Sequence, residues 1–112
     1  MKKKIYIAGK VTGEPKHTTA LKFATAKKEI EALGFDAVNP LEVVGDWNMP
    51  WDVAMRKCIV AMMECDGVVV LPDFGNSKGA MIEHDLANSL GMPVWTSTKI
   101  GHEFLSAYKW NN

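Results

Sequence analysis

Residues 67–72, Gly-Val-Val-Val-Leu-Pro, constrain the fold of this chain more than any other segment. Four apolar residues follow one another without polar alternation. A strand with one solvent-facing side would alternate, so this run predicts a central strand covered on both faces, as in parallel sheets. Parallel strands need long crossover connections, usually helices. The segment therefore predicts an α/β fold with helices on both faces of the sheet.

The remaining segments fit this plan. Residues 4–8, 35–38 and 93–96 are short runs rich in β-branched and aromatic side chains, which predict strands. Helical periodicity predicts helices over about 17–33, 50–64, 79–90 and 101–110, with loops over 39–50 and 73–78. Strands alternating with helices predict right-handed crossovers. We expect one domain, residues 1–112, with a small Rossmann- or flavodoxin-like three-layer sandwich and four or five parallel strands.

The charge balance limits the partners. The 112 residues carry 13 Lys and Arg against 13 Asp and Glu, a formal net charge of zero. Binding to nucleic acid polymers or anionic membranes rests on excess positive charge, so we expect neither. The expected partner is a small molecule. A neutral protein also tends to self-associate, which predicts a homo-oligomer, a dimer or larger.

The compartment follows from two features. The apolar run at 5–8 is too short for a signal sequence or a membrane span. Cys58 and Cys65 fall in one expected helix, roughly 10 Å apart along its axis, too far for a disulfide. Free thiols without an export signal predict a cytoplasmic protein.

The sequence offers no metal site or cofactor motif. The histidines at 17, 84 and 102 are scattered and lack metal-ligand spacing with Cys, Asp or one another. No Ser-His-Asp arrangement emerges either. We therefore expect neither a metal nor a cofactor.

Glu83 is the most informative single residue. The third helix has its apolar stripe at Leu86, Ala87 and Leu90, and the helical period carries this stripe back to Glu83. Burying a carboxylate there is costly unless it is hydrogen-bonded, although the nearby helix start favours an anion. Glu83 is therefore a candidate nucleophile or base. The alternative is a boundary glutamate satisfied by the helix end or by Lys78.

The residues before this helix form a second candidate. Asn76 or Ser77 would cap the helix. The exposed N–H groups beside Gly79 could hold a phosphate. Simple capping is the alternative.

A third candidate is the loop after the first strand. In parallel sheets, ligands lie beyond the carboxyl ends of the strands near the switch point, where this loop is expected. The loop matches neither the Walker A nor the GxGxxG pattern. Its candidate binding residues are Gly9, Lys10, Thr12 and Gly13. We expect Tyr6 to be half-buried, with its hydroxyl toward the strand end.

The loop before the second helix holds two tryptophans, Trp47 and Trp51, more than a connector needs. An interaction surface, an oligomer interface or a lid that stacks on a base would each explain them.

Several segments together resemble one family. They are Tyr6-Ile7-Ala8-Gly9 with Thr12-Gly13, Val38-Asn39-Pro40, Cys65-Asp66-Gly67, and residues 77–83 with Ala87. This combination is similar to the DUF4406 family, small proteins frequent in phages and prophages, within the nucleoside 2-deoxyribosyltransferase-like superfamily. The resemblance covers about residues 4–95.

The resemblance implies cleavage of the N-glycosidic bond of a nucleoside or nucleoside monophosphate, by hydrolysis or transfer. In that chemistry a glutamate attacks the anomeric carbon, and Glu83 matches it. Tyr6 matches the tyrosine that positions the glutamate. Ser77 is similar to the phosphate-contacting serine of the deoxynucleoside monophosphate N-hydrolases. Gly9 and Thr12 match the loop on the phosphate or sugar side.

The sequence departs from the family at one position. Related enzymes carry an aspartate eight residues before the aspartate that opens the third strand, and it helps protonate the leaving base. Counting back from Asp66 gives Cys58, and a thiol is a poor general acid. Asp52 and Glu64 are not at the matching position. The alternative function is therefore a non-catalytic module that sequesters or senses a nucleotide-like ligand.

Overall fold

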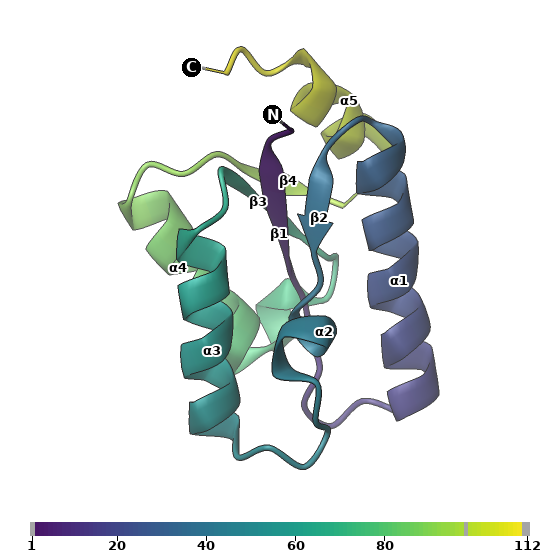
Figure 1. The fold of residues 1–112 in the computed structure, drawn as a ribbon, viewed down its shortest axis with the longest axis vertical. Helices are drawn as coiled ribbons and strands as arrows, with labels where there is room; N and C mark the ends of the chain where they lie inside the picture. The colour runs from purple at the N-terminus through teal and green to yellow at the C-terminus, as the bar shows by residue number, and fades with distance from the viewer. Residues whose placement is uncertain (1, 98, 111–112) are drawn as a thin grey trace.

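The strands of this computed structural model, which describes residues 2–97 and 99–110, form one all-parallel sheet. They are β1 (Lys4–Ala8), β2 (Asp36–Val38), β3 (Gly67–Val70) and β4 (Val94–Thr96), in the order β2-β1-β3-β4 (Figure 1). The predicted parallel sheet of four or five strands is confirmed, with four strands in the described residues. The chain order reverses between β1 and β3, which makes this pair the switch point.

Helices cover both faces of the sheet (Figure 1). Helices α1 (Lys16–Ala32) and α5 (Lys99–Ala107) pack on one face, and α3 (Trp51–Met63) and α4 (Lys78–Ser89) on the other. The short α2 (Pro40–Val44) lies near the carboxyl ends of the strands, and the 3-10 helix η1 (Phe74–Asn76) precedes α4. The result is the predicted three-layer, small Rossmann- or flavodoxin-like fold.

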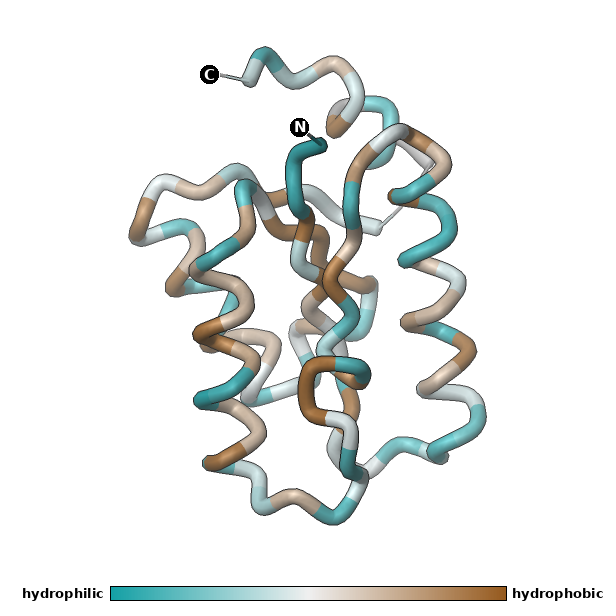
Figure 2. The backbone as a smooth tube through the Cα atoms, in the orientation of Figure 1, coloured by the Kyte–Doolittle hydropathy of each residue, from teal (hydrophilic) through white to brown (hydrophobic). Residues whose placement is uncertain are grey.

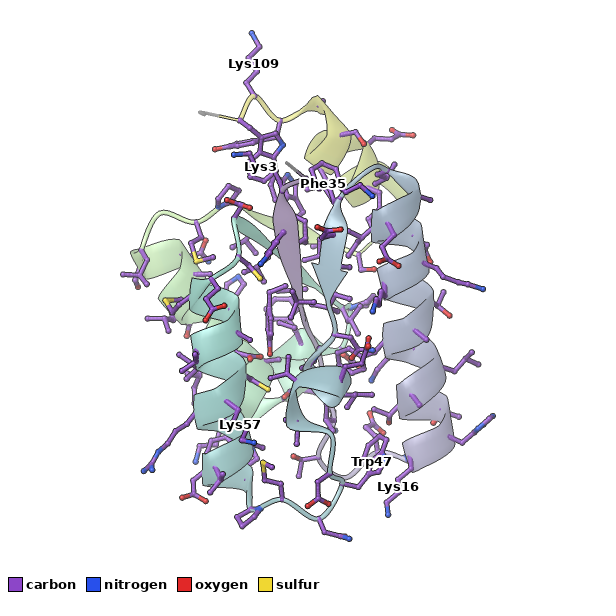
Figure 3. All side chains as sticks on the ribbon, in the orientation of Figure 1. Lys3, Lys16, Phe35, Trp47, Lys57 and Lys109 are labelled. Atoms are coloured by element: carbon purple, nitrogen blue, oxygen red, sulfur yellow. The ribbon has the colours of Figure 1, made fainter. Side chains whose placement is uncertain are left out.

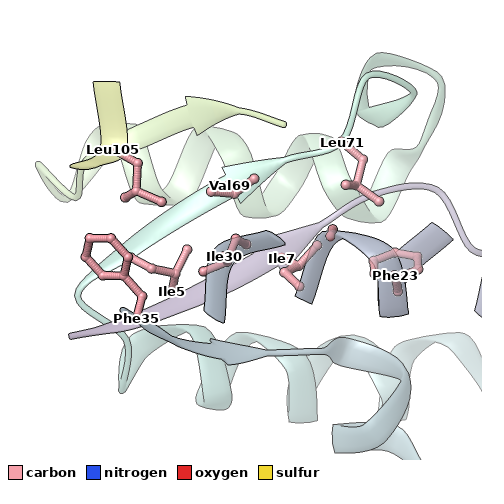
Figure 4. Packing of buried hydrophobic residues seen from close by; sticks show 9 residues of the cluster. Ile5, Ile7, Phe23, Ile30, Phe35, Val69, Leu71 and Leu105 are labelled. Carbon is pink, nitrogen blue, oxygen red and sulfur yellow. The ribbon is translucent and has the colours of Figure 1, made fainter. Parts of the chain in front are cut away.

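The sheet divides the core into two clusters, because successive side chains of a strand point to opposite faces. Ile5, Ile7, Val69 and Leu71 face α1 and Leu105 of α5 (Figure 4). Tyr6, Ala8, Val68 and Val70 face Cys58 and Met62 of α3 and Ala80 and Ala87 of α4. All four residues of β3 are buried, as its unbroken apolar run predicted. In Figure 2 hydrophobic segments accordingly run along the central strands.

Helix α2 was not predicted, because residues 39–50 were expected to form a loop. Its local signals are clear: Asn39 Oδ1 accepts a hydrogen bond from the Leu41 N–H at 3.0 Å, and Pro40 occupies the first helical position. Gly45 ends the helix with a φ of 69°. With only five residues, the helix is too short for hydrophobic periodicity to reveal it.

The ends of the other helices also differ from expectation. Leu90, placed on the buried stripe of α4, follows the last helical residue and is 57% exposed. The last helix is Lys99–Ala107 rather than 101–110. The chain leaves the helix there, and Trp110 packs against Trp95 and Phe35 instead.

Both cysteines are free thiols, as their spacing predicted. No helix in the described part of the chain is long and apolar enough to cross a membrane. Within residues 2–97 and 99–110, no three His, Cys, Asp or Glu side chains come together to hold a metal ion.

Candidate functional site

A cavity of about 660 Å³ opens at the carboxyl edge of the sheet. Its wall includes Gly9, which follows β1, and Glu83, which lies on the helix that follows β3. This is the switch point, where parallel α/β folds bind ligands. Helix α2, the start of α3 and the loop between them form much of the remaining wall. Of the sequence candidates, the cavity brings together Gly9, Thr12, Gly13, Cys58, Ser77, Gly79 and Glu83.

Glu83 lies in the second turn of α4 and faces the sheet with only 5% of its surface exposed. Its Oε2 accepts a hydrogen bond from the Tyr6 hydroxyl at 2.5 Å. Lys78, the alternative partner considered from the sequence, places its ammonium over the Trp51 ring instead, 4.7 Å from the centroid. Glu83 is thus held by a residue of the central strand, 77 positions away in sequence.

Tyr6 is fully buried, so the expectation of a half-buried side chain was wrong. Strand β1 is central in the sheet, and α3 and α4 cover the face on which Tyr6 lies. Its hydroxyl can satisfy its hydrogen-bonding capacity only inside the protein, and Glu83 provides the acceptor.

Burial raises the pKa of Glu83 to about 7, even though the hydrogen bond from Tyr6 favours the ionised form. Burial also raises the pKa of Tyr6, and the charge of Glu83 raises it further. Tyr6 therefore stays a proton donor, while Glu83 exists in both protonation states near neutral pH. A carboxyl group poised in this way suits a nucleophile or base.

Cys58 lies beside this pair on α3 and also lines the cavity. Cys58 is 7% exposed, and burial raises the pKa of its thiol. Tyr6 and Glu83 both affect the pKa of this thiol, Tyr6 lowering it and Glu83 raising it. Cys58, Tyr6 and Glu83 therefore form one buried cluster. The protonated thiol is a poor nucleophile.

The start of α4 forms another part of the wall. The Ser77 hydroxyl caps the helix by accepting a hydrogen bond from the Ala80 N–H at 3.1 Å. Ser77 and Gly79 line the cavity, whereas Asn76 ends η1 and is not part of the wall. A Cβ atom at Gly79 would lie 3.0 Å from the Met55 sulfur, so a glycine allows α3 to approach α4 closely.

The loop after β1 is fixed to the loop after β3 by Asp73. Asp73 accepts hydrogen bonds from the Lys10 N–H at 3.0 Å and from Lys22 Nζ at 2.6 Å. Lys22 Nζ also donates to the Lys10 carbonyl at 2.8 Å. Partial burial raises the pKa of Asp73, but these bonds outweigh it and lower the pKa overall. Lys10 thus holds its loop through its backbone and is not part of the cavity wall.

Sequence reasoning did not single out Asn39 as a site residue. Asn39 is 8% exposed and lines the cavity. Its Oδ1 caps α2, which leaves the Nδ2 group of the amide for a ligand. The cap-and-proline pair Asn39-Pro40 was the signal that could have located α2 and this side chain.

Trp47 and Trp51, expected in the loop before the second predicted helix, both line the cavity, and Trp51 is the first residue of α3. Trp47 is 46% exposed and Trp51 40% exposed. Exposed indole rings beside a cavity offer flat apolar surfaces for a ligand.

The fold and the cavity define a class: a doubly wound parallel α/β protein with a buried carboxyl group at the floor of a switch-point cavity. Comparison with family models gives the particular family. The model described as "Domain of unknown function (DUF4406)" matches residues 3–96, so the chain belongs to this family. Comparison with curated proteins gave no significant match.

Proposed function

We propose that the protein cleaves the N-glycosidic bond of a nucleoside or nucleoside monophosphate, by hydrolysis or transfer, with Glu83 as nucleophile. The observation that carries this proposal is the buried Glu83 of the switch-point cavity, which accepts a hydrogen bond from the Tyr6 hydroxyl behind it. A carboxyl group is seldom buried unless it is paired or functional. The pKa of about 7 leaves enough carboxylate at neutral pH to react.

Glu83 and Tyr6 each have a role in this chemistry. The Glu83 carboxylate attacks the anomeric carbon, and a covalent glycosyl-enzyme forms as the base departs. The transition state resembles an oxocarbenium ion, whose positive charge a nearby carboxylate stabilises. Tyr6 orients Glu83 through its hydroxyl. Water or a second base then releases the sugar and regenerates the carboxylate.

A second candidate function rests on Cys58. The resemblance places a proton-donating aspartate at this position, and the buried thiol is a poor general acid. A cavity with a thiol at the position of the expected acid fits a non-catalytic module that sequesters or senses a nucleotide-like ligand. Ser77 and Gly79 at the start of α4 would then hold a phosphate.

The superfamily, the cellular location, the origin and the oligomeric state belong to the same proposal. The sequence segments that resemble the nucleoside 2-deoxyribosyltransferase-like superfamily include Tyr6, Ser77 and Glu83, the residues given roles above. A cytoplasmic location, a phage or prophage origin and a homo-oligomer are the corresponding expectations. The two free thiols are consistent with a reducing compartment.

The direct test incubates the protein with a panel of nucleosides and nucleoside monophosphates and measures free base by chromatography. We expect base release by the native protein and none by Glu83→Ala, with folding of both checked by circular dichroism. Base release that continues unchanged in Glu83→Ala contradicts the nucleophile assignment. If no base is released but a nucleotide raises the melting temperature, the binding module is favoured.

Cys58→Asp tests the departure from the family pattern. If the missing acid alone limits the rate, this change raises base release, because general acid catalysis contributes about 100- to 10,000-fold. Cys58→Ser, which also introduces a polar atom but no acid, is the matched control. Equal effects of both substitutions would assign the change to polarity or packing rather than to proton donation.

A further inference from the structure

Among the described residues, Glu83 is the only carboxyl side chain of the cavity wall that is buried, and burial is what raises a carboxyl pKa enough for proton donation near neutral pH. Besides Glu83, its carboxyl side chains are Glu14, Glu42 and Asp46. Glu42 is paired with Lys27 at 2.7 Å, and Asp46 accepts a hydrogen bond from the Asn48 N–H at 2.9 Å. Both therefore act as acceptors. Glu14, in the loop before α1, is half-buried.

A leaving group that needs no proton could depart from this cavity without a separate general acid. When the glycosidic nitrogen of a neutral base departs, it takes the bonding electron pair and becomes negatively charged unless an acid protonates it. When that nitrogen belongs to a positively charged ring, the same electron pair neutralises the ring. The departing heterocycle is then neutral, and the contribution of a general acid, about 100- to 10,000-fold, is not required.

The charges of the cavity wall favour such a ring. Four carboxyl side chains line the cavity in the described residues, against one ammonium group, that of Lys16. Lys27 offsets Glu42, and the Lys78 ammonium lies over the Trp51 ring of the wall, so three further carboxyl groups face two ammonium groups. A concave wall with an excess of one charge sign concentrates ligands of the opposite sign.

The exposed indole of Trp47 adds a contact suited to a cationic ring. Trp47 is 46% exposed on the cavity wall, and Figure 3 places it at the foot of the molecule toward the start of α1. Tryptophan is the best partner for a cation over an aromatic face. The Trp51 ring already carries the Lys78 ammonium, which shows this type of contact at the same cavity.

We propose that the substrate is an N-glycoside of a positively charged heterocycle, such as a pyridinium or an N7-alkylated purine, whose ring stacks on Trp47 while its sugar faces Glu83. This inference rests on the proposed function and names its substrate class. Trp47 is then a specificity-determining residue.

The reaction balances without an added acid or oxidant. A Glu83 carboxylate oxygen forms a bond to the anomeric carbon as the carbon–nitrogen bond breaks, and its electron pair passes to the cationic ring nitrogen. The heterocycle leaves as a neutral molecule. Water then attacks the anomeric carbon of the glycosyl ester, Glu83 regains its charge as the leaving carboxylate, and one proton passes to solvent.

The test uses substrates that differ mainly in charge. The first pair is N7-methylguanosine and guanosine, each as ribo- and 2′-deoxyribonucleoside, with and without a 5′-phosphate. The second pair is nicotinamide riboside and its neutral 1,4-dihydro form. Free base is measured by chromatography, and the spontaneous rate in buffer is subtracted. We expect kcat/KM for the cationic member to exceed that for the neutral member by about 100-fold or more, the contribution of the missing acid.

Two variants assign this preference to residues. Trp47→Leu should lower kcat/KM for the cationic substrates by about 3- to 30-fold, the range of a cation–π contact, while Trp47→Phe retains part of it. Cys58→Asp should raise the rate for guanosine and leave the cationic substrates nearly unchanged, since their leaving groups need no acid. Melting temperatures confirm that each variant is folded.

The outcomes separate the two proposals. Equal or faster cleavage of the neutral members overturns the cationic substrate class and leaves the Glu83 glycosidase intact. Cleavage of the cationic members that is unaffected by Trp47→Leu overturns the role of Trp47. Absence of cleavage for every substrate overturns the inference together with the proposed function.

Discussion

The two ends of the sheet use tryptophan in opposite ways. At the amino edge, the rings of Trp95 and Trp110 pack with centroids 5.7 Å apart, and Tyr108 lies 4.8 Å from Trp110. At the carboxyl edge, Trp47 and Trp51 are 46% and 40% exposed around the cavity. Figure 3 shows Phe35, a further ring of the amino-edge cluster, at the end opposite Trp47.

The polar groups show the same contrast. At the amino edge, Asp66 accepts a hydrogen bond from the Lys4 N–H at 2.8 Å and joins the starts of β1 and β3. At the carboxyl edge, Glu83 is buried with a pKa raised to about 7, which is a cost to stability above that pH. The amino edge therefore favours stability, whereas the carboxyl edge holds a buried carboxyl group that costs stability above pH 7.

The largest expected effect separates the two edges by activity. Glu83→Gln should lower base release by about 1,000-fold or more, because it removes the proposed nucleophile while keeping the size of the side chain. Trp95→Phe, at the amino edge, should retain the activity of the folded protein. The measurement is kcat/KM for both variants. A similar loss in both would mean that the edges are not functionally distinct.

The next largest expected effect is on the pH dependence of the free energy of unfolding. Because the pKa of Glu83 is raised from 4.5 to about 7, the folded state keeps a proton that the unfolded chain has already released. Stability from this group is therefore lost as pH rises from about 4.5 to 7, by about 3 kcal/mol in total.

The measurement is urea unfolding of the native protein and Glu83→Gln at pH 5 and pH 8. Other titrating groups contribute equally to both, so we expect the variant to gain stability relative to the native protein at the higher pH. If the free energy of unfolding had the same pH dependence in both proteins, the raised pKa of the buried Glu83 carboxyl group would be contradicted.

Gly67→Ala tests whether a change at the amino edge lowers stability without affecting activity. A Cβ atom at Gly67 would lie 2.8 Å from the Trp95 ring and 3.3 Å from the Pro93 carbonyl oxygen. We expect a loss of about 1–3 kcal/mol in the free energy of unfolding, typical of overpacking, with unchanged kcat/KM at temperatures where the protein is folded. Gly75→Ala, where a Cβ atom meets nothing within 4 Å, is the matched control.

The smallest expected effect concerns the loops of the carboxyl edge. Asp73→Asn removes the ion pair with Lys22 but keeps an oxygen that can accept from the Lys10 N–H. We expect a loss of about 1 kcal/mol, because the pair is partly exposed. Amide hydrogen exchange should become faster in residues 9–13. Unchanged exchange there would show that Asp73 does not hold this loop.

The sheet could be predicted because each strand has its own local signal. The unbroken run of β3 and the β-branched β1 do not depend on distant residues. Helix α2 could not be found in this way, since its five residues span little more than one turn. Its cap Asn39 therefore went unnoticed as a residue of the cavity.

The site could be predicted in part. Glu83 was visible because it interrupts the apolar stripe of its own helix. Its hydrogen bond with Tyr6 depends on which side of β1 faces α4, a property of the assembled sheet. The family resemblance predicted this pair, whereas the residue pattern alone predicted a half-buried Tyr6. The positions of Trp47 and Trp51 on the cavity wall likewise depend on how α2 and α3 meet.

The most direct test of the central claim is the mass of the intact protein, quenched in acid during turnover of the best substrate. The proposed mechanism predicts a species heavier by one glycosyl group, with the added mass on the peptide that contains Glu83, and no such species for Glu83→Gln. Base release by the native protein with the added mass on a different residue, or at an equal rate in Glu83→Gln, would contradict it.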